Sequence, residues 1–96
     1  MIKALRKHFV YIVECSDGSL YTGYSVDVEK RVDKHNTGKG AKYTRVRLPV
    51  KLVFKIEVVN KSEALKLEHM IKKLTRKQKK ELISSEDISL MFSSTH

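Results

Sequence analysis

The chain has 96 residues, 41% hydrophobic and 32% charged, so one domain with a single modest core is expected. Its apolar runs are far shorter than the roughly 20 residues that span a bilayer, and no apolar segment typical of a secretory signal follows the basic N-terminus. Twenty lysines and arginines against eleven acidic residues leave a net charge of +9, which favours a polyanionic partner, above all nucleic acid. Cys15 is the only cysteine, which excludes an internal disulfide and a cysteine-rich zinc site and indicates a reducing, cytoplasmic setting.

A β-hairpin is predicted near the N-terminus. Residues 9–15 are β-branched and aromatic, and apolar side chains occupy both sets of alternate positions, which is typical of a strand inside a sheet. Residues 19–25 form the expected partner strand, because Asp17-Gly18 between the two segments is a strong hairpin signal. This arrangement places Tyr11 and Tyr21 on neighbouring strands.

A short helix and then a loop are predicted to follow. Asp27 is a typical N-cap residue, and the sequence Asn-Thr-Gly at residues 36–38 is typical of a helix end. The segment 37–49 is interpreted as a loop, since Pro49 disfavours helix and introduces the next strand.

One strand and two helices are predicted in the second half. Residues 50–59 alternate between apolar and mostly polar side chains, which predicts a strand with one apolar face, and the lysines suit a sheet edge. Asn60 or Ser62 can cap the helix that follows. The apolar stripe of this helix is expected to comprise Ala64, Leu65, Leu67, Met70, Ile71 and Leu74. A second capping box, Thr75 with Gln78, predicts a further helix.

These elements predict an α+β fold with the order β-β-α-β-α-α, a three-stranded antiparallel sheet flanked by helices. If the strand 9–15 is central, the other two strands lie parallel to each other on either side of it, and their crossover is right-handed. The domain is expected to occupy residues 1–83. Residues 84–96 are expected to form a serine-rich C-terminal tail with an apolar segment at 88–92.

Several polar residues have ordinary explanations when each is considered alone. Tyr11 and Tyr21 suit half-buried strand positions, and Arg31 suits a solvated or salt-bridged site on a helix. Glu68 can form an i, i+4 ion pair within its helix, and His35 can act as a cation near the C-terminal end of the first helix. Function is indicated only by the combination of these residues.

The combination is an ordered set along the chain. In order, the set comprises Phe9-Val10-Tyr11, nine intervening residues, Tyr21-Thr22-Gly23, Arg31 and Glu68. This set resembles the GIY-YIG nuclease family. The runs at residues 16–24 and 35–45 are similar to the small standalone bacterial branch of that family, which is related to the nuclease subunit of a structure-specific DNA resolvase. The resemblance covers about residues 8–80 and implies the GIY-YIG endonuclease fold.

The resemblance also implies an activity. GIY-YIG domains hydrolyse DNA phosphodiester bonds, which implies action on branched or damaged DNA in repair or recombination, with Mg²⁺ or Mn²⁺ held by Glu68. One protein carboxylate suits Mg²⁺, which keeps several of its waters. Arg31 is implied to bind the scissile phosphate, and Tyr11, Tyr21 and His35 complete the implied catalytic set.

Either Tyr21 or Tyr11 is implied to deprotonate the attacking water, and Tyr21 is favoured because its spacing to Arg31 is better defined. A free tyrosine titrates at about 10, so a base active near neutral pH needs about 4 kcal/mol of help from nearby cations. One position departs from the pattern. Some family members carry a lysine three residues after the second tyrosine, where this chain has Tyr24.

Basic side chains interleaved with an aromatic ring are typical of DNA backbone contacts with a stacking option. The candidate nucleic-acid-binding residues are Lys39, Lys42, Tyr43, Arg45 and Lys72, and Arg47 lies in the same loop as the first four. The alternative interpretation is a solvated, mobile loop. The basic run between Lys72 and Lys80 has the same two interpretations, since charged helical faces are usually just hydrated.

Two other functions are considered. A domain with this fold but without efficient turnover would be a nucleic-acid-binding accessory module. We expect no second domain for substrate selection, so a protein partner would then direct the domain to its substrate. A plain interaction protein would instead use the apolar segment 88–92 for docking.

Overall fold

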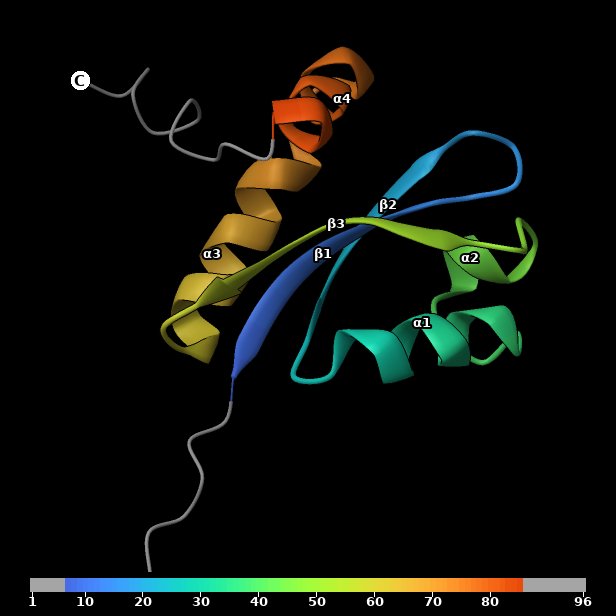
Figure 1. Ribbon diagram of the computed structural model, residues 1–96, viewed down its shortest axis with the longest axis horizontal. Helices are drawn as coiled ribbons and strands as arrows, with labels where there is room; N and C mark the ends of the chain where they lie inside the picture. Colours follow the sequence, from blue (N-terminus) through green and yellow to red (C-terminus); the bar gives the residue numbers. More distant parts are fainter. Residues whose placement is uncertain (1–6, 86–96) are drawn as a thin grey trace, which may run out of the picture.

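The computed structural model of the protein describes residues 7–85. Its elements are β1 (His8–Glu14), β2 (Leu20–Ser25), α1 (Val28–Asn36), α2 (Lys42–Arg45), β3 (Lys51–Val58), α3 (Lys61–Lys72) and α4 (Arg76–Ser85). The three strands form an antiparallel sheet in the order β2-β1-β3, with α1 and α2 on one side and α3 and α4 on the other (Figure 1). The predicted α+β fold and the central position of the first strand are confirmed.

Side-chain caps fix the helix ends where the sequence predicts them. The Asp27 carboxylate accepts a backbone N–H from the first turn of α1 at 3.1 Å. Asn60, rather than Ser62, caps α3 and accepts a backbone N–H at 2.8 Å. Thr75 and Gln78 exchange two hydrogen bonds of 2.9 and 3.1 Å, so the capping box that starts α4 is confirmed.

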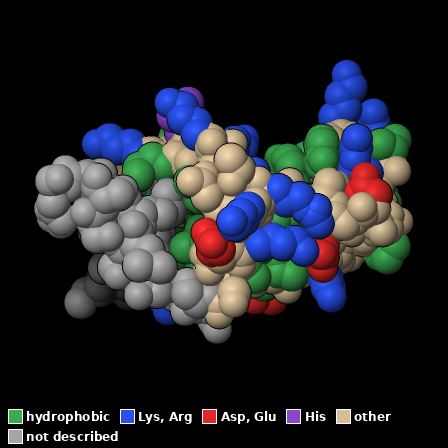
Figure 2. All heavy atoms as spheres, turned by 90° about the horizontal axis from the view of Figure 1, so that it is seen from above, with side chains coloured by type: hydrophobic (Ala, Val, Ile, Leu, Met, Phe, Trp, Pro, Cys, Tyr) green, Lys and Arg blue, Asp and Glu red, His purple; other side chains and the backbone are tan. Residues whose placement is uncertain are grey.

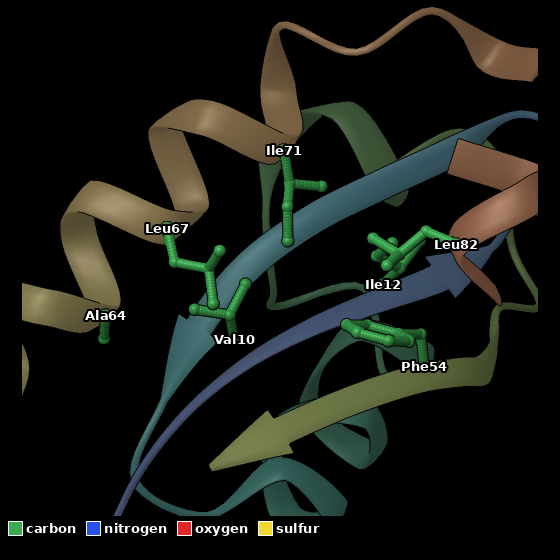
Figure 3. Close-up of a cluster of buried hydrophobic side chains, with 7 residues drawn as sticks. All are labelled: Val10, Ile12, Phe54, Ala64, Leu67, Ile71 and Leu82. Atoms are coloured by element: carbon green, nitrogen blue, oxygen red, sulfur yellow. The ribbon is translucent and has the colours of Figure 1, made fainter. Parts of the chain in front are cut away.

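The sheet divides the buried side chains into two apolar clusters. The cluster under α3 and α4 contains Val10, Ile12, Phe54, Ala64, Leu67, Ile71 and Leu82 (Figure 3). The cluster under α1 contains Tyr11, Val13, Cys15, Val28 and Val50. Successive β1 side chains enter opposite clusters, because side chains alternate across a strand.

The prediction of a single apolar face along the third strand is wrong. Phe54 pairs with Ile12, but Leu52 pairs with Val13, so Val53 is an extra residue in β3. This bulge turns Leu52 to the α1 side of the sheet, while Phe54 stays on the α3 side. The two halves of β3 therefore contribute side chains to different clusters.

Three further predictions differ from the structure, and one lies outside the residues that it describes. The segment interpreted as a loop contains α2, and Leu65 is 45% exposed rather than part of the α3 stripe. The last helix continues to Ser85, past the expected start of the tail, and the apolar segment 88–92 lies outside the described residues. Between residues 7 and 85, no helix is long and apolar enough to cross a membrane.

Candidate active site

Tyr11 lies on the side of the sheet that α1 covers. It is 1% exposed, comes from the central strand and pairs directly with Gly23 on β2. A Cβ atom on Gly23 would lie 2.5 Å from the Tyr11 hydroxyl oxygen, so only glycine lets β2 pass this close to the phenol. Gly23, the last residue of Tyr21-Thr22-Gly23, therefore has a steric role that the sequence alone did not reveal.

Helix α1 brings two candidate side chains to Tyr11. Arg31 and His35 are four residues apart and share one face of the helix, beside the packing residues Val28 and Val32. His35 Nε2 lies 2.8 Å from the Tyr11 hydroxyl, and the Arg31 side chain also hydrogen-bonds this hydroxyl. The first helix is thus the element that assembles the site.

The position of the His35 ring proton follows from its neighbours. The backbone N–H of Ala41 donates to His35 Nδ1 at 3.3 Å, and an amide nitrogen can only donate. Nδ1 is therefore unprotonated, and the ring proton sits on Nε2, which donates to the Tyr11 hydroxyl oxygen. The Thr44 hydroxyl lies 2.8 Å from Nδ1 and 3.0 Å from the carbonyl oxygen of Ala41, so its single proton is shared between these two acceptors.

His35 is neutral rather than cationic. It is 1% exposed, and its pKa lies below the usual 6.5 because burial, and next the positive charge of Arg31, disfavours the imidazolium. The alternative in which His35 acts as a cation at the end of α1 is therefore wrong.

The pKa of Tyr11 is raised well above its usual value. Burial is the largest cause, followed by the charge of Tyr21 and, more weakly, that of Glu68, while Arg31 opposes the shift by charge and by hydrogen bonding. Tyr11 is therefore a neutral phenol at pH 7. The same interactions place Tyr21, Arg31, His35 and Glu68, from three other elements, around one phenol group.

Tyr21 is the more accessible of the two tyrosines. Its ring centroid lies 5.5 Å from that of His35 in an edge-on contact, and 6.0 Å from that of Tyr43 in a stacked one. The ammonium of Lys72 lies 6.0 Å from the Tyr21 ring centroid. Tyr21 thus joins the buried part of the site to its basic rim.

Glu68 comes from α3, which packs against β1 and β2. Its side chain is 18% exposed and pairs with Lys72 at 3.1 Å, so the expected i, i+4 ion pair is present. Among the described residues, no three His, Cys, Asp or Glu side chains converge. A single carboxylate such as that of Glu68 suits a hard divalent cation that brings its own waters and phosphate ligands.

The loop after α1 supplies the rim of the site. Tyr43 is 39% exposed, and the Arg47 guanidinium lies 3.9 Å from the centroid of its ring. Arg47 also pairs with Asp17 in the hairpin turn at 3.1 Å, which fastens α2 to the β1–β2 hairpin. The exposed cations of this loop are Lys39, Lys42 and Arg45.

Sequence analysis missed the buried support of His35. Thr44 is fully buried against the His35 ring, and a Cβ on Gly40 would collide with the same ring. Asn36 ties the end of α1 to β3 by bonds of 2.7 and 3.0 Å with the Val50 backbone. Thr44, Gly40 and Asn36 all lie in the run that carried the resemblance, and this was the only available signal.

Tyr24, where some family members carry lysine, faces away from Tyr21. It pairs with Val10 on the α3 side of the sheet, and its hydroxyl lies 2.8 Å from Nδ1 of His8. Lys72, not residue 24, is the cation that lies beside the Tyr21 ring.

Comparison with known proteins identifies the domain that carries these residues. Residues 7–81 match the GIY-YIG catalytic domain. The chain belongs to the GIY-YIG family. It is therefore a member of a nuclease superfamily whose enzymes typically use a divalent metal.

Other members of the family are small proteins of similar length. A UPF0213 protein of Staphylococcus epidermidis is 64% identical over 77 residues, which cover 80% of this chain and 94% of that protein. A UPF0213 protein of Staphylococcus saprophyticus is 59% identical over 78 residues, covering 81% and 95%.

Two solution NMR structures have the same GIY-YIG fold. The UPF0213 protein BH0048 from Bacillus halodurans is 51% identical, with a TM-score of 0.53 and coverage of 81% of this chain and 83% of that one. The protein EF2693 from E. faecalis is 41% identical, with a TM-score of 0.58 and coverage of 88% and 90%.

Proposed function

We propose that this protein is a metal-dependent DNA endonuclease that hydrolyses phosphodiester bonds, with branched or damaged DNA in repair or recombination as its substrate. One observation carries the proposal. Side chains from β1, β2, α1 and α3 meet at one place, because His35 contacts both Tyr11 and Tyr21 while Lys72 contacts both Tyr21 and Glu68. Arg31 lies one helical turn before His35 on α1. Phosphoryl transfer needs such a set, with a proton acceptor, a cation for the phosphate and a carboxylate for a metal.

Arg31 is assigned to the scissile phosphate. Its guanidinium is a planar donor that stays charged at any physiological pH, and it matches the geometry of two phosphate oxygens. It lies half-buried beside Tyr11, where low dielectric strengthens its interaction with the charge that develops on the phosphorane oxygens.

Glu68 is assigned to the metal, with Mg²⁺ or Mn²⁺ as the cation. When bound, a divalent ion polarises the phosphate and lowers the pKa of a coordinated water. Glu68 would hold the cation in place of its present ion pair with Lys72. Lys72 would then be available to a phosphate or to the Tyr21 ring beside it.

The two tyrosines have different assigned roles. Tyr21 is assigned as the general base, because it is only half-buried, so water can reach it, and it lies beside the ammonium of Lys72. Tyr11 is the positioning group, because its raised pKa keeps it protonated. With His35 donating to its oxygen, the Tyr11 proton is free to point at a substrate or water oxygen.

The loop cations are assigned to the DNA backbone. Lys39, Lys42 and Arg45 are exposed beside Tyr43, whose ring stacks on Tyr21 at the entrance of the site. This arrangement supports phosphate contacts with a stacked base next to the scissile bond. The single cysteine, Cys15, is a buried free thiol, which supports a reducing cytoplasmic setting.

Incubation of the purified protein with nicked, flap and branched DNA tests the proposal. We expect cleavage in Mg²⁺ or Mn²⁺, none with a chelator, and a loss of about 10²- to 10³-fold in Arg31→Ala. Lys34→Ala removes the same charge from an exposed position of the same helix and is expected to cut as the wild type does. Salt-dependent binding without cleavage of any substrate would instead support the accessory binding module.

A further inference from the structure

We propose that the cationic surface running from the end of α3 across α4 binds the phosphate backbone of a duplex DNA arm beside the cleavage site. This inference rests on the proposed function, since it concerns the DNA that the site acts on. The surface, here called the α4 strip, comprises Lys72, Lys73, Arg76, Lys77, Lys79 and Lys80. These six cations fall within nine consecutive residues that contain no acidic side chain.

The α4 strip faces outward because of how α4 packs. Leu82 is 4% exposed and belongs to the core cluster, and Ile83 packs against the same cluster. Lys77 and Lys80 point away from these two residues and are exposed, and Arg76 is also exposed. Figure 2, seen from the α4 side, shows lysine and arginine side chains gathered in the middle of this face, with acidic side chains directly beside them.

The strip is continuous with the candidate active site. Lys72 at one end lies 6.0 Å from the Tyr21 ring centroid. Arg76 lies against the hairpin turn, where its guanidinium is 3.6 Å from the Cβ position of Gly18, and with Lys79 it lines a hollow of about 280 Å³ beside Asp17 and Ser19. A duplex placed at Tyr21 that continues toward α4 therefore meets cations next.

Acidic side chains lie near the strip at Asp17 and Glu81, but Lys72 is the one cation of the strip with an ion pair among the described residues. On α3, Glu63 pairs with Lys66 and Glu68 with Lys72, but no residue of the strip after Lys72 forms an ion pair with any residue between 7 and 85. Arg76 and Lys80 are four residues apart, and like charges at this spacing weaken a helix. A bound polyanion relieves this repulsion more strongly than solvent and salt, which only screen it.

Duplex DNA is the polyanion that matches this surface. It presents one charge per about 1.7 Å of axis, so several closely spaced lysines can each meet a phosphate without reading sequence. The strip contains no aromatic residue to stack on unpaired bases, in contrast to the Tyr43 side of the site. The two cationic flanks of Tyr21 are thus suited to different parts of one substrate.

The test measures binding apart from cleavage. Glu68→Gln serves as the parent protein, so that a fluorescent duplex is not cut, and anisotropy gives its affinity at several salt concentrations. In this background we compare two double variants. The strip variant carries Lys77→Gln and Lys80→Gln, and the control variant carries Lys61→Gln and Lys66→Gln. The control removes the same charge from the N-terminal half of α3, and glutamine keeps helix propensity in both.

We expect the strip substitutions to reduce the slope of log affinity against log salt by about 2 and to weaken binding about fivefold to tenfold per contact at 0.1 M salt. The control is expected to leave the slope unchanged. Unchanged binding in the strip variant, an equal loss in the control, or a parent that binds no duplex would overturn the inference. If the strip variant loses binding while the wild type cleaves no DNA, the strip stands and the proposed hydrolysis falls.

Discussion

The two faces of the sheet surround neighbouring side chains of β1 with different kinds of residue. On the α3 face, Val10 and Ile12 of β1 enter a cluster of aliphatic and aromatic side chains. On the α1 face, the neighbouring Tyr11 enters a buried group that contains the polar side chains of His35 and Thr44. Adjacent residues of β1 therefore contribute to the apolar core on one face and to the candidate site on the other.

This difference predicts that substitutions on the two faces have different effects. Apolar burial stabilises in proportion to area and tolerates some change of shape, whereas a buried polar group needs each of its partners. Substitutions in the apolar cluster of the α3 face should therefore act mainly on the free energy of unfolding, whereas substitutions in the polar group of the α1 face can affect cleavage, stability or both.

The largest effect on stability is expected from the α3 face. Ile71 is fully buried between α3 and the sheet (Figure 3), so Ile71→Ala should lower the free energy of unfolding by about 2 to 5 kcal/mol. Denaturant titration measures the loss. Leu65→Ala is the matched control, since Leu65 is 45% exposed on the same helix and should change stability by less than about 0.5 kcal/mol. Equal losses would contradict the assigned core.

The largest effect on cleavage by a residue outside the proposed catalytic set is expected at Gly23. The Cβ atom of Gly23→Ala would displace the Tyr11 hydroxyl, and misplacement of a reacting group by about 1 Å can reduce a rate about 10²-fold. Single-turnover cleavage measures the effect, with circular dichroism to check the fold. A folded variant with the wild-type rate would show that the position of Tyr11 is irrelevant to the reaction.

A smaller effect is expected at Thr44, whose hydroxyl is a partner of His35 Nδ1. Thr44→Val leaves that nitrogen with the Ala41 amide alone and should lower the free energy of unfolding by about 1 to 3 kcal/mol. Thr37→Val, an exposed threonine near the end of α1, is the control and should cost less than about 0.5 kcal/mol. Thermal and denaturant unfolding of both variants decide the comparison.

The smallest expected effect is a pH dependence of stability. The pKa of His35 is lowered in the folded protein, by burial first and by Arg31 second, so the unfolded chain binds more protons once the pH falls below about 6.5. The contribution of His35 is fully present above this pH and is lost as the pH falls toward the folded pKa. His35→Gln should flatten this dependence, while substitution of the exposed His69 should not; an unchanged slope in His35→Gln would contradict the assignment.

Much of the fold could be predicted because its signals are local. The caps at Asp27, Asn60 and Thr75 depend on residues three positions apart, and the central position of β1 follows from its own apolar pattern. The bulge at Val53 could not be predicted, because it depends on the register with a strand 40 residues away in sequence.

The site shows the same limit. The resemblance selected Tyr11, Tyr21, Arg31 and Glu68 from residue types and spacing, and the structure brings all four together. The sequence did not reveal that Tyr11 is buried with a raised pKa, or that Thr44 supports His35. Both facts arise from contacts between segments that meet only after folding.

Cleavage of branched DNA by Glu68→Gln tests the central claim most directly. Glutamine keeps the shape of the side chain but removes the only carboxylate assigned to the metal. We expect cleavage to fall by at least about 100-fold in Mg²⁺ or Mn²⁺, while the melting temperature stays near that of the wild type because the lost ion pair with Lys72 lies near the surface. A folded Glu68→Gln protein that cleaves DNA at the wild-type rate would contradict the claim that this site is the nuclease centre.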